Sequence, residues 1–172
     1  MTKSAGVEAW KEQTTAFDRI QSVASAVYKP RSVSYIADEA HVPENAARDH
    51  LDRLVELNVL LKRDQDGTAH YAPDPLHTRM QMLRELLEQH DRDSLIQLKT
   101  SLQSQIGDWQ SQYNIKSSAT LCTRAAETET SEQTQEIRKI AADWELISYR
   151  LSIIEDAIEN YDTYSKDFRM SA

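Results

Sequence analysis

The pattern of apolar and polar residues predicts helices along most of the chain and an extended segment only between residues 59 and 72. Apolar residues recur at helical spacing near the N-terminus and predict a first helix over residues 7–28. That helix should end before Pro30, because the residue that precedes a proline avoids the helical conformation. We therefore expect the chain to begin with a long helix.

A helix-turn-helix layout follows the first helix. Ser32 is a suitable N-cap for a short helix that ends at Ala40, and a further helix should begin near Glu44, directly after Pro43. Small or apolar side chains stand where two such helices would have to cross closely. The positions expected to be buried are Ile36, Ala40, Val42, Ala47 and Leu51.

Two short extended runs, residues 59–63 and 68–72, come next in the chain. Asp66 and Gly67 between them favour a tight hairpin turn, because glycine accepts the positive φ angle that such turns require. Three helices followed by a β-hairpin wing predict a winged helix-turn-helix domain over residues 1–75.

The remaining residues, 76–172, contain no proline and one glycine, so long helices can run there without a breaker. The polar run 89–93 predicts a kink or a break, with Asp93 as the N-cap of the helix that follows. Residues 114–130 predict a loop that holds a short helix, and Thr130 starts a capping-box sequence for the last helix.

The last helix should run from Ser131 to Tyr164, and its apolar residues alternate at spacings of three and four. A seam of this kind, sustained for several heptads, is typical of a coiled-coil interface. It has to pack on the preceding long helix, on a second copy of the chain, or on both. The residues expected to make a homodimer are Ile137, Ile140, Trp144, Ile147, Leu151, Ile154, Ile158 and Tyr161.

Charge complicates a nucleic-acid function. The 172 residues carry a net charge of −8, and the first 75 contain nine Lys or Arg against twelve Asp or Glu. Basic domains are the usual footprint of DNA binding, so this acidity argues against it. The alternative is a halophilic protein that works at very high salt, where the Debye length falls to about 3 Å and an acidic surface repels DNA only weakly.

Several other classes are disfavoured by what the sequence lacks. No apolar stretch approaches the roughly 18 residues that cross a membrane, and no signal core is present, so we expect a cytoplasmic protein without membrane partners. Cys122 is the single cysteine and the five histidines are scattered, so we expect no metal and no other cofactor. The common catalytic motifs for phosphate, acyl and zinc chemistry are missing too, which argues against an enzyme.

The exposed start of the helix at Glu44 offers side chains for reading the major groove. Asn45 and Arg48 have bidentate geometry that suits adenine and guanine, and Ala46 can contact a thymine methyl group. Basic residues on the wing and before the second helix should contact phosphate. The alternative for these residues is an ordinary solvated helix face. The candidate DNA-binding residues are Lys29, Arg31, Ser32, Glu44, Asn45, Ala46, Arg48, Asp49, Arg53, Lys62, Arg63, Thr68 and His70.

These residues also carry a resemblance. Residues 31–63 resemble the winged helix-turn-helix of ArsR- and MarR-like regulators of bacteria and archaea. Residues 15–19 and 47–51, together with the pair Trp144-Glu145, resemble a haloarchaeal family of such regulators. The resemblance covers nearly the whole chain and implies a dimeric DNA-binding repressor or activator in a salt-accumulating archaeon. It implies no particular ligand.

The sequence therefore predicts a mostly α-helical transcription regulator. A winged helix-turn-helix at residues 1–75 would bind double-stranded DNA, and long coiled-coil-like helices at residues 76–172 would form the homodimer. A small-molecule effector is not indicated by any motif. The alternative is an acidic winged-helix and coiled-coil module that joins a protein assembly and does not bind DNA. A basic recognition face would favour the regulator, and an acidic one would favour the protein-interaction module.

Overall fold

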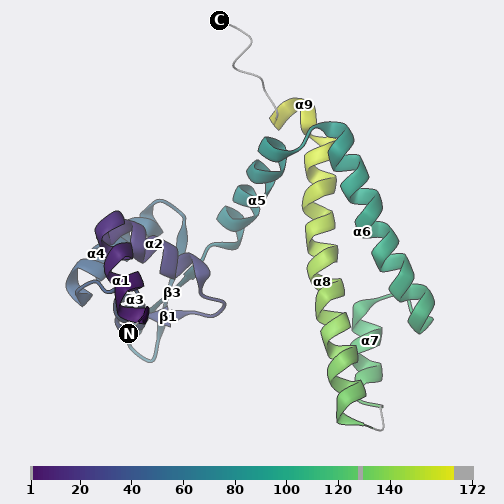
Figure 1. Cartoon of the computed structure of the whole chain (residues 1–172), viewed down its shortest axis with the longest axis horizontal. Coiled ribbons are helices and arrows are strands. Elements are labelled where there is room, and N and C mark those ends of the chain that lie inside the picture. Colours follow the sequence, from purple (N-terminus) through teal and green to yellow (C-terminus); the bar gives the residue numbers. More distant parts are fainter. Residues whose placement is uncertain (1, 128–129, 165–172) are drawn as a thin grey trace, which may run out of the picture. The chain divides into compact units, whose positions relative to one another are not determined.

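The computed structural model of the chain describes residues 2–127 and 130–164. It is mostly helical with one small antiparallel sheet, and it divides into two compact units, residues 1–80 and 81–172 (Figure 1). Across the described residues, every helix is too short or too polar to span a bilayer. The elements of the first unit are α1 (Thr2–Gln13), α2 (Ala16–Ala26), β1 (Arg31–Ser32), α3 (Val33–Ala40), α4 (Glu44–Glu56), β2 (Leu60–Gln65) and β3 (Thr68–Pro73).

The N-terminal region forms two helices, α1 and α2, so the prediction of one helix over residues 7–28 is wrong. The break is a capping box at Thr15. Its hydroxyl accepts a hydrogen bond from the Asp18 N–H at 3.1 Å, and the Asp18 carboxylate accepts one from the Thr15 N–H at 3.0 Å. The two bonds satisfy donors that a helix start would otherwise leave unpaired, so α2 begins anew here.

Helices α3 and α4 form where the sequence predicts them. The Ser32 hydroxyl caps α3 by accepting from the Tyr35 N–H at 3.3 Å. His41 ends the helix in the left-handed conformation, with φ at 53°, and α4 starts at Glu44. The five positions expected to be buried at the crossing are all buried, which confirms this part of the pattern.

The sheet has the strand order β1-β3-β2 and is antiparallel throughout. Strands β2 and β3 form the predicted hairpin, and its turn residues Asp66 and Gly67 have φ angles of 54° and 75°. Strand β1 was not predicted, because two residues carry no periodicity of their own and become a strand only by pairing with β3.

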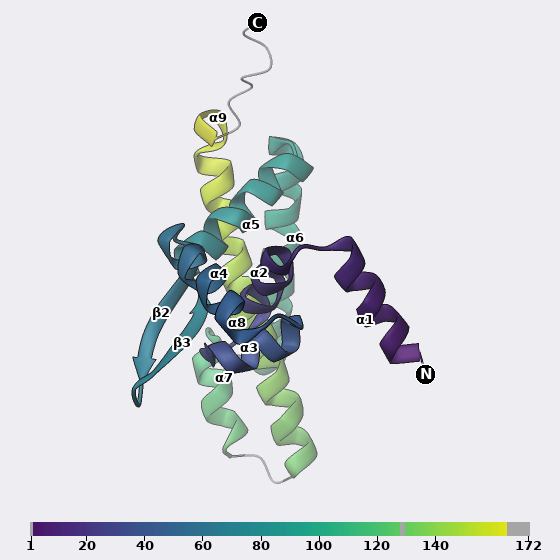
Figure 2. The ribbon, with the colours of Figure 1, turned by 90° about the vertical axis from the view of Figure 1, so that its left-hand side faces the viewer.

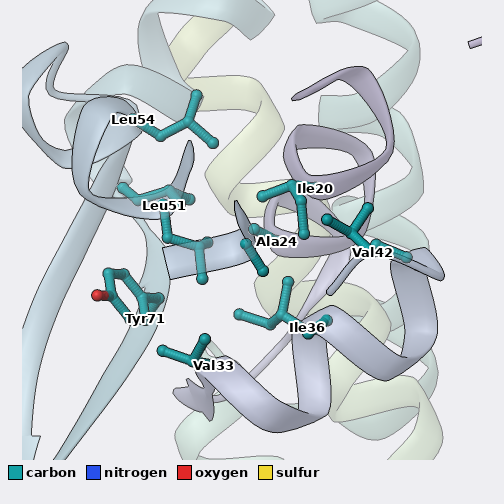
Figure 3. Close-up of a cluster of buried hydrophobic side chains, with 12 residues drawn as sticks. Ile20, Ala24, Val33, Ile36, Val42, Leu51, Leu54 and Tyr71 are labelled. Atoms are coloured by element: carbon teal, nitrogen blue, oxygen red, sulfur yellow. The ribbon is translucent and has the colours of Figure 1, made fainter. Parts of the chain in front are cut away.

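One apolar core holds the first unit together and brings α2, α3, α4 and the sheet into contact (Figure 3). The hydroxyl of Tyr71 points away from the other labelled side chains in Figure 3, although its ring is fully buried. The buried members of this core are Ile20, Ala24, Val33, Ile36, Ala37, Ala40, Val42, Ala47, Leu51, Leu54, Leu60 and Tyr71.

The second unit is helical. Its elements are the end of α5 (Pro75–Gln89), α6 (Arg92–Tyr113), α7 (Ser118–Ala125), α8 (Ser131–Glu159) and α9 (Tyr161–Tyr164). A break between α5 and α6 is present as predicted, but the N-cap of α6 is Asp91, which accepts from the Ser94 N–H at 2.8 Å. The prediction of Asp93 as the cap is wrong, because Asp93 already lies in the first turn of α6.

The remaining predictions for this unit concern α7 and α8. The short helix α7 lies within the predicted loop region 114–130, of which residues 128 and 129 fall outside the described residues. Thr130 caps α8 as predicted, by accepting from the Gln133 N–H at 3.3 Å. The last helix does not run unbroken to Tyr164, because α8 ends at Glu159 with Asn160 as its C-cap, and α9 follows.

Helix α8 packs on α6 along much of its length and on α7 near its N-terminal end (Figures 1 and 2). One apolar cluster, around Leu121 and Trp144, joins α8 to α6 and α7. A second cluster, around Leu95 and Ile154, joins α8 to α5 and α6. The long apolar seam of α8 is therefore covered in large part from within the chain.

Candidate nucleic-acid interface

The start of α4 presents the side chains that the sequence proposes for reading bases. Glu44, Asn45, Arg48 and Asp49 are exposed, as a reading face requires. Ala46 is half-buried and packs against the core of the first unit, so its methyl group is less accessible than the sequence suggests.

The charge of this face is negative. Helix α4 contains four carboxylates against two arginines. One of the arginines, Arg48, forms an ion pair with Glu44 at 3.3 Å, one helical turn earlier. The other, Arg53, lies with its guanidinium 6.0 Å from the Phe17 ring. The recognition face predicted from the sequence thus carries little free positive charge.

Lys62 of β2 is also paired with an acid of α4. Its ammonium donates to the Asp52 carboxylate at 2.7 Å, and the Tyr71 hydroxyl donates to the same oxygen, also at 2.7 Å. The hydrogen bond from Lys62 is the main cause that lowers the pKa of Asp52, and the same bond raises the pKa of Lys62. Burial is the main cause that raises the pKa of Tyr71. Lys62 therefore ties the wing to α4.

A different group of cations stands at the entry to β1. Lys29 is exposed, and its ammonium lies 5.8 Å from the Tyr28 ring. The Arg31 guanidinium lies 5.8 Å from the same ring and 4.3 Å from the Tyr35 ring. Stacking on aromatic faces orients a guanidinium while leaving its edge N–H groups able to donate to phosphate.

A second set of polar side chains lies on the outer face of the sheet. Ser32, His70 and Arg63 are direct neighbours on β1, β3 and β2, so their side chains share one face of the sheet. The buried Tyr71 belongs to the opposite face, which covers the core. Asp64, next to Arg63 in the chain, belongs to the opposite face by the same alternation, and its carboxylate accepts from the Gly67 N–H at 2.9 Å.

These cations lack acidic partners within the described residues. Among the residues that the structure describes, neither Lys29, Arg31 nor Arg63 takes part in an ion pair. Arg31 and Glu39 both line a hollow between the end of α2 and α3, but they do not form an ion pair with each other. We call Tyr28, Lys29, Arg31, Tyr35, Arg63 and His70 the β1–hairpin set. Arg31 pairs with Tyr71 and so lies on the side of the sheet opposite to Arg63 and His70.

The structure thus separates the proposed DNA-binding residues into two groups. Glu44, Asn45, Arg48 and Asp49 lie on α4, whereas Lys29, Arg31, Ser32, Arg63 and His70 lie along β1 and the wing. Thr68 is exposed at the start of β3, and its carbonyl oxygen lies 3.0 Å from the His70 Nδ1. Sequence reasoning missed Tyr28 and Tyr35, although two tyrosines that flank Lys29 and Arg31 were a visible signal.

The residues proposed for dimerisation also divide into two groups. Ile137, Ile140, Trp144, Ile154, Ile158 and Tyr161 belong to the two apolar clusters within the second unit. Ile147 and Leu151 are half-buried and belong to neither cluster. Leu146 and Tyr149, which the sequence did not single out, are the large apolar side chains that α8 exposes most among its described residues.

Metal ligands do not gather anywhere in the described part of the chain: no group of three or more His, Cys, Asp or Glu side chains there has the spacing to hold an ion. Cys122 is exposed on α7. The first unit displays charged and aromatic side chains around an apolar core.

Comparison with known proteins identifies a family of unknown function. The model of a family of unknown function, DUF7342, matches residues 14–163. A crystal structure described as that of a transcriptional regulator aligns with 86% of this chain and 85% of its own chain, at 10% identity and a TM-score of 0.34. A structural similarity with a TM-score of 0.34 is too low to support a conclusion about fold or function. No curated protein matches this chain.

Proposed function

The chain belongs to the family of unknown function DUF7342, and we propose that it is a DNA-binding regulator whose first unit is a winged helix-turn-helix. Two helices joined by a tight turn and followed by a hairpin, α3 to β3, are the parts that such a domain needs. In this proposal α4 enters the major groove of double-stranded DNA, and the wing lies on the phosphate backbone.

The observation that carries the proposal is the β1–hairpin set. Within the described part of the chain its cations have no acidic partner, whereas Arg48 and Lys62 are paired with Glu44 and Asp52. Free cations supply most of the sequence-independent affinity for DNA, because each phosphate contact releases counterions. We therefore assign the anchoring contacts to Lys29, Arg31 and Arg63.

In this proposal the exposed face of α4 distinguishes one base sequence from another. Asn45 is exposed and available for a bidentate contact with adenine. Arg48 has to exchange Glu44 for a guanine edge, which costs part of the energy of that contact. The acids of α4 oppose DNA at low salt, and screening at high salt weakens that repulsion. We accordingly expect a shallow dependence of affinity on salt.

The test is a binding measurement with the full chain and its own genomic DNA fragments, by fluorescence anisotropy in low and in molar salt. Replacing Lys29, Arg31 or Arg63 by Gln should weaken binding to all sequences about equally. Arg48→Ala should instead cost about 1–3 kcal/mol at one base pair and relax specificity there. Lys139→Gln, on α8 of the second unit, is the matched control and should bind like the wild type.

A protein-interaction module is the second candidate, and the acidic face of α4 favours it. Four carboxylates on one helix suit a basic protein partner better than a phosphate backbone. If the wild type binds no genomic fragment at any salt concentration, the DNA proposal is wrong and this candidate takes its place.

A further inference from the structure

The second unit contains a hollow of about 210 Å³ between α5, α6 and α8. Ile153 and Ile154 of α8 form its floor and are almost completely buried. Three half-buried side chains, Met82, Leu86 and Leu98, complete the apolar lining. The hollow is smaller than the roughly 300 Å³ at the lower end of drug-sized sites, so it suits a small metabolite.

Polar side chains stand at the rim of this hollow, and two of them carry opposite fixed charges. Glu85 comes from α5 and Arg150 from α8, and both are exposed. Within residues 2–127 and 130–164, neither has an ion pair or a side-chain hydrogen bond. Elsewhere on these helices opposite charges do meet, as Lys99 and Glu155 do at 3.3 Å. Glu85 and Arg150 thus flank the hollow without neutralising each other.

From this arrangement we propose that the hollow binds a small zwitterion with an apolar body, namely a free amino acid with an apolar side chain. The Arg150 guanidinium would take the carboxylate, for which its planar pair of N–H donors is suited. The Glu85 carboxylate would accept from the ammonium group. The side chain of the ligand would lie on Ile153, Ile154 and Leu86.

Charge matching supports a zwitterion over a simple anion or cation. A ligand with one charge gains a charge-assisted contact with only one of Glu85 and Arg150. A zwitterion pairs with both at once. Gln89 and His90, also at the rim, offer further hydrogen-bonding groups. Every lining residue belongs to the second unit, so this proposal does not rest on the DNA-binding residues proposed for the first unit.

The experiment is isothermal titration calorimetry on the full chain with L-leucine and with two analogues that each lack one charge. Isoamylamine lacks the carboxylate, and 4-methylpentanoate lacks the ammonium group. We expect L-leucine to bind at least about tenfold more tightly than either analogue, since each charge-assisted contact is worth about one such factor. L-Aspartate, which lacks an apolar side chain, should not bind.

Two variants assign the charges. Arg150→Gln should remove the preference for L-leucine over isoamylamine, and Glu85→Gln should remove the preference for L-leucine over 4-methylpentanoate. Arg138→Gln on α8 and Glu88→Gln on α5 change the same charges outside the hollow and should keep both preferences. Both pocket residues are exposed, so the variants should fold, and circular dichroism with thermal unfolding checks this.

Three results would overturn the proposal. One is that L-leucine fails to bind the wild type at millimolar concentration. Another is that 4-methylpentanoate binds as tightly as L-leucine, which would mean that Glu85 takes no part. The last is that the control variants lose affinity to the same degree as the pocket variants, which would show a general effect of charge.

Discussion

At the scale of single residues, Asp52 links two parts of the first unit, α4 and the β2–β3 hairpin. One of its carboxylate oxygens accepts from both the Lys62 ammonium and the Tyr71 hydroxyl. Without Asp52, the hydroxyl of a fully buried tyrosine would lose its partner. Asp52 therefore holds the β2–β3 hairpin against α4 and also accepts the hydrogen bond of the Tyr71 hydroxyl.

We predict that Asp52→Asn destabilises the protein by about 1 kcal/mol near neutral pH, since the ion pair is half-exposed and screened by solvent. The pKa of Asp52 is lowered on folding, so its contribution exists above the ordinary pKa of a carboxyl group. It is lost as the pH falls through the lowered pKa of the folded state. Urea unfolding of both proteins over the acid range measures the difference.

The difference between wild type and Asp52→Asn should therefore vanish at low pH. Asp49→Asn, on the same helix and exposed, is the control and should change stability little at any pH. A difference that persists unchanged at the acid end would contradict the role given to the Asp52 carboxylate.

Sequence reasoning placed Lys62 on phosphate because it stands on the wing, and it had no means of seeing Asp52. The two residues are ten positions apart and meet only when the hairpin folds against α4. Arg31 was a better candidate than Lys62 for a phosphate contact, because its neighbours in the chain include no acidic residue. Whether a basic residue is free depends on tertiary pairing, which local sequence does not encode.

At the scale of elements, two glycines should respond to alanine in opposite directions. Gly67 occupies the hairpin turn at a φ of 75°, where a Cβ atom is strained even though space is available. Gly107 lies in the interior of α6, and a Cβ atom there would meet nothing within 4 Å. The first residue is required by its turn, whereas the second weakens its helix.

We predict that Gly67→Ala destabilises the first unit by about 1 kcal/mol and that Gly107→Ala stabilises the second by about 0.5–1 kcal/mol. Scanning calorimetry of the full chain measures both, because it resolves separate transitions if the two units unfold separately. Shifts of the same sign in both variants would contradict the backbone conformations described for these glycines.

Most elements could be predicted because residues next to their ends in the sequence determine where they begin and end. Ser32, Pro43 and the Asp66-Gly67 turn place α3, α4 and the hairpin correctly. The break before α2 was missed, because the apolar stripe continues across it and hides the capping pair of Thr15 with Asp18. The strand β1 was beyond prediction, since its pairing with β3 is not local.

At the scale of the whole molecule, the seam of α8 was read correctly as a packing surface, but periodicity does not identify what packs on it. Six of the eight residues proposed for the seam, of which Tyr161 lies on α9, belong to apolar clusters shared with α5, α6 or α7. The large apolar side chains that α8 exposes most, among its described residues, are Leu146 at 57% and Tyr149 at 41%. These two residues are three positions apart and so lie on the same side of the helix.

We predict that the chain is a homodimer in solution and that Leu146 contributes to the contact. Sedimentation of the full chain at tens of micromolar should give twice the 19.7 kDa of one chain, in low and in molar salt. Leu146→Asp should raise the dissociation constant of the dimer at least about tenfold, because burying one leucine side chain is worth about 1.5–3 kcal/mol. The variant should remain folded, since Leu146 is exposed within the chain.

Ser148→Asp is the matched control, because it adds the same charge two residues further on and therefore on the opposite side of α8. It should leave the mass at that of the dimer. If the wild type is monomeric at these concentrations, α8 serves only the fold of its own chain, and DNA binding would have to proceed through a single copy. If both variants dissociate the dimer equally, repulsion between acidic chains, rather than the apolar contact at Leu146, controls assembly.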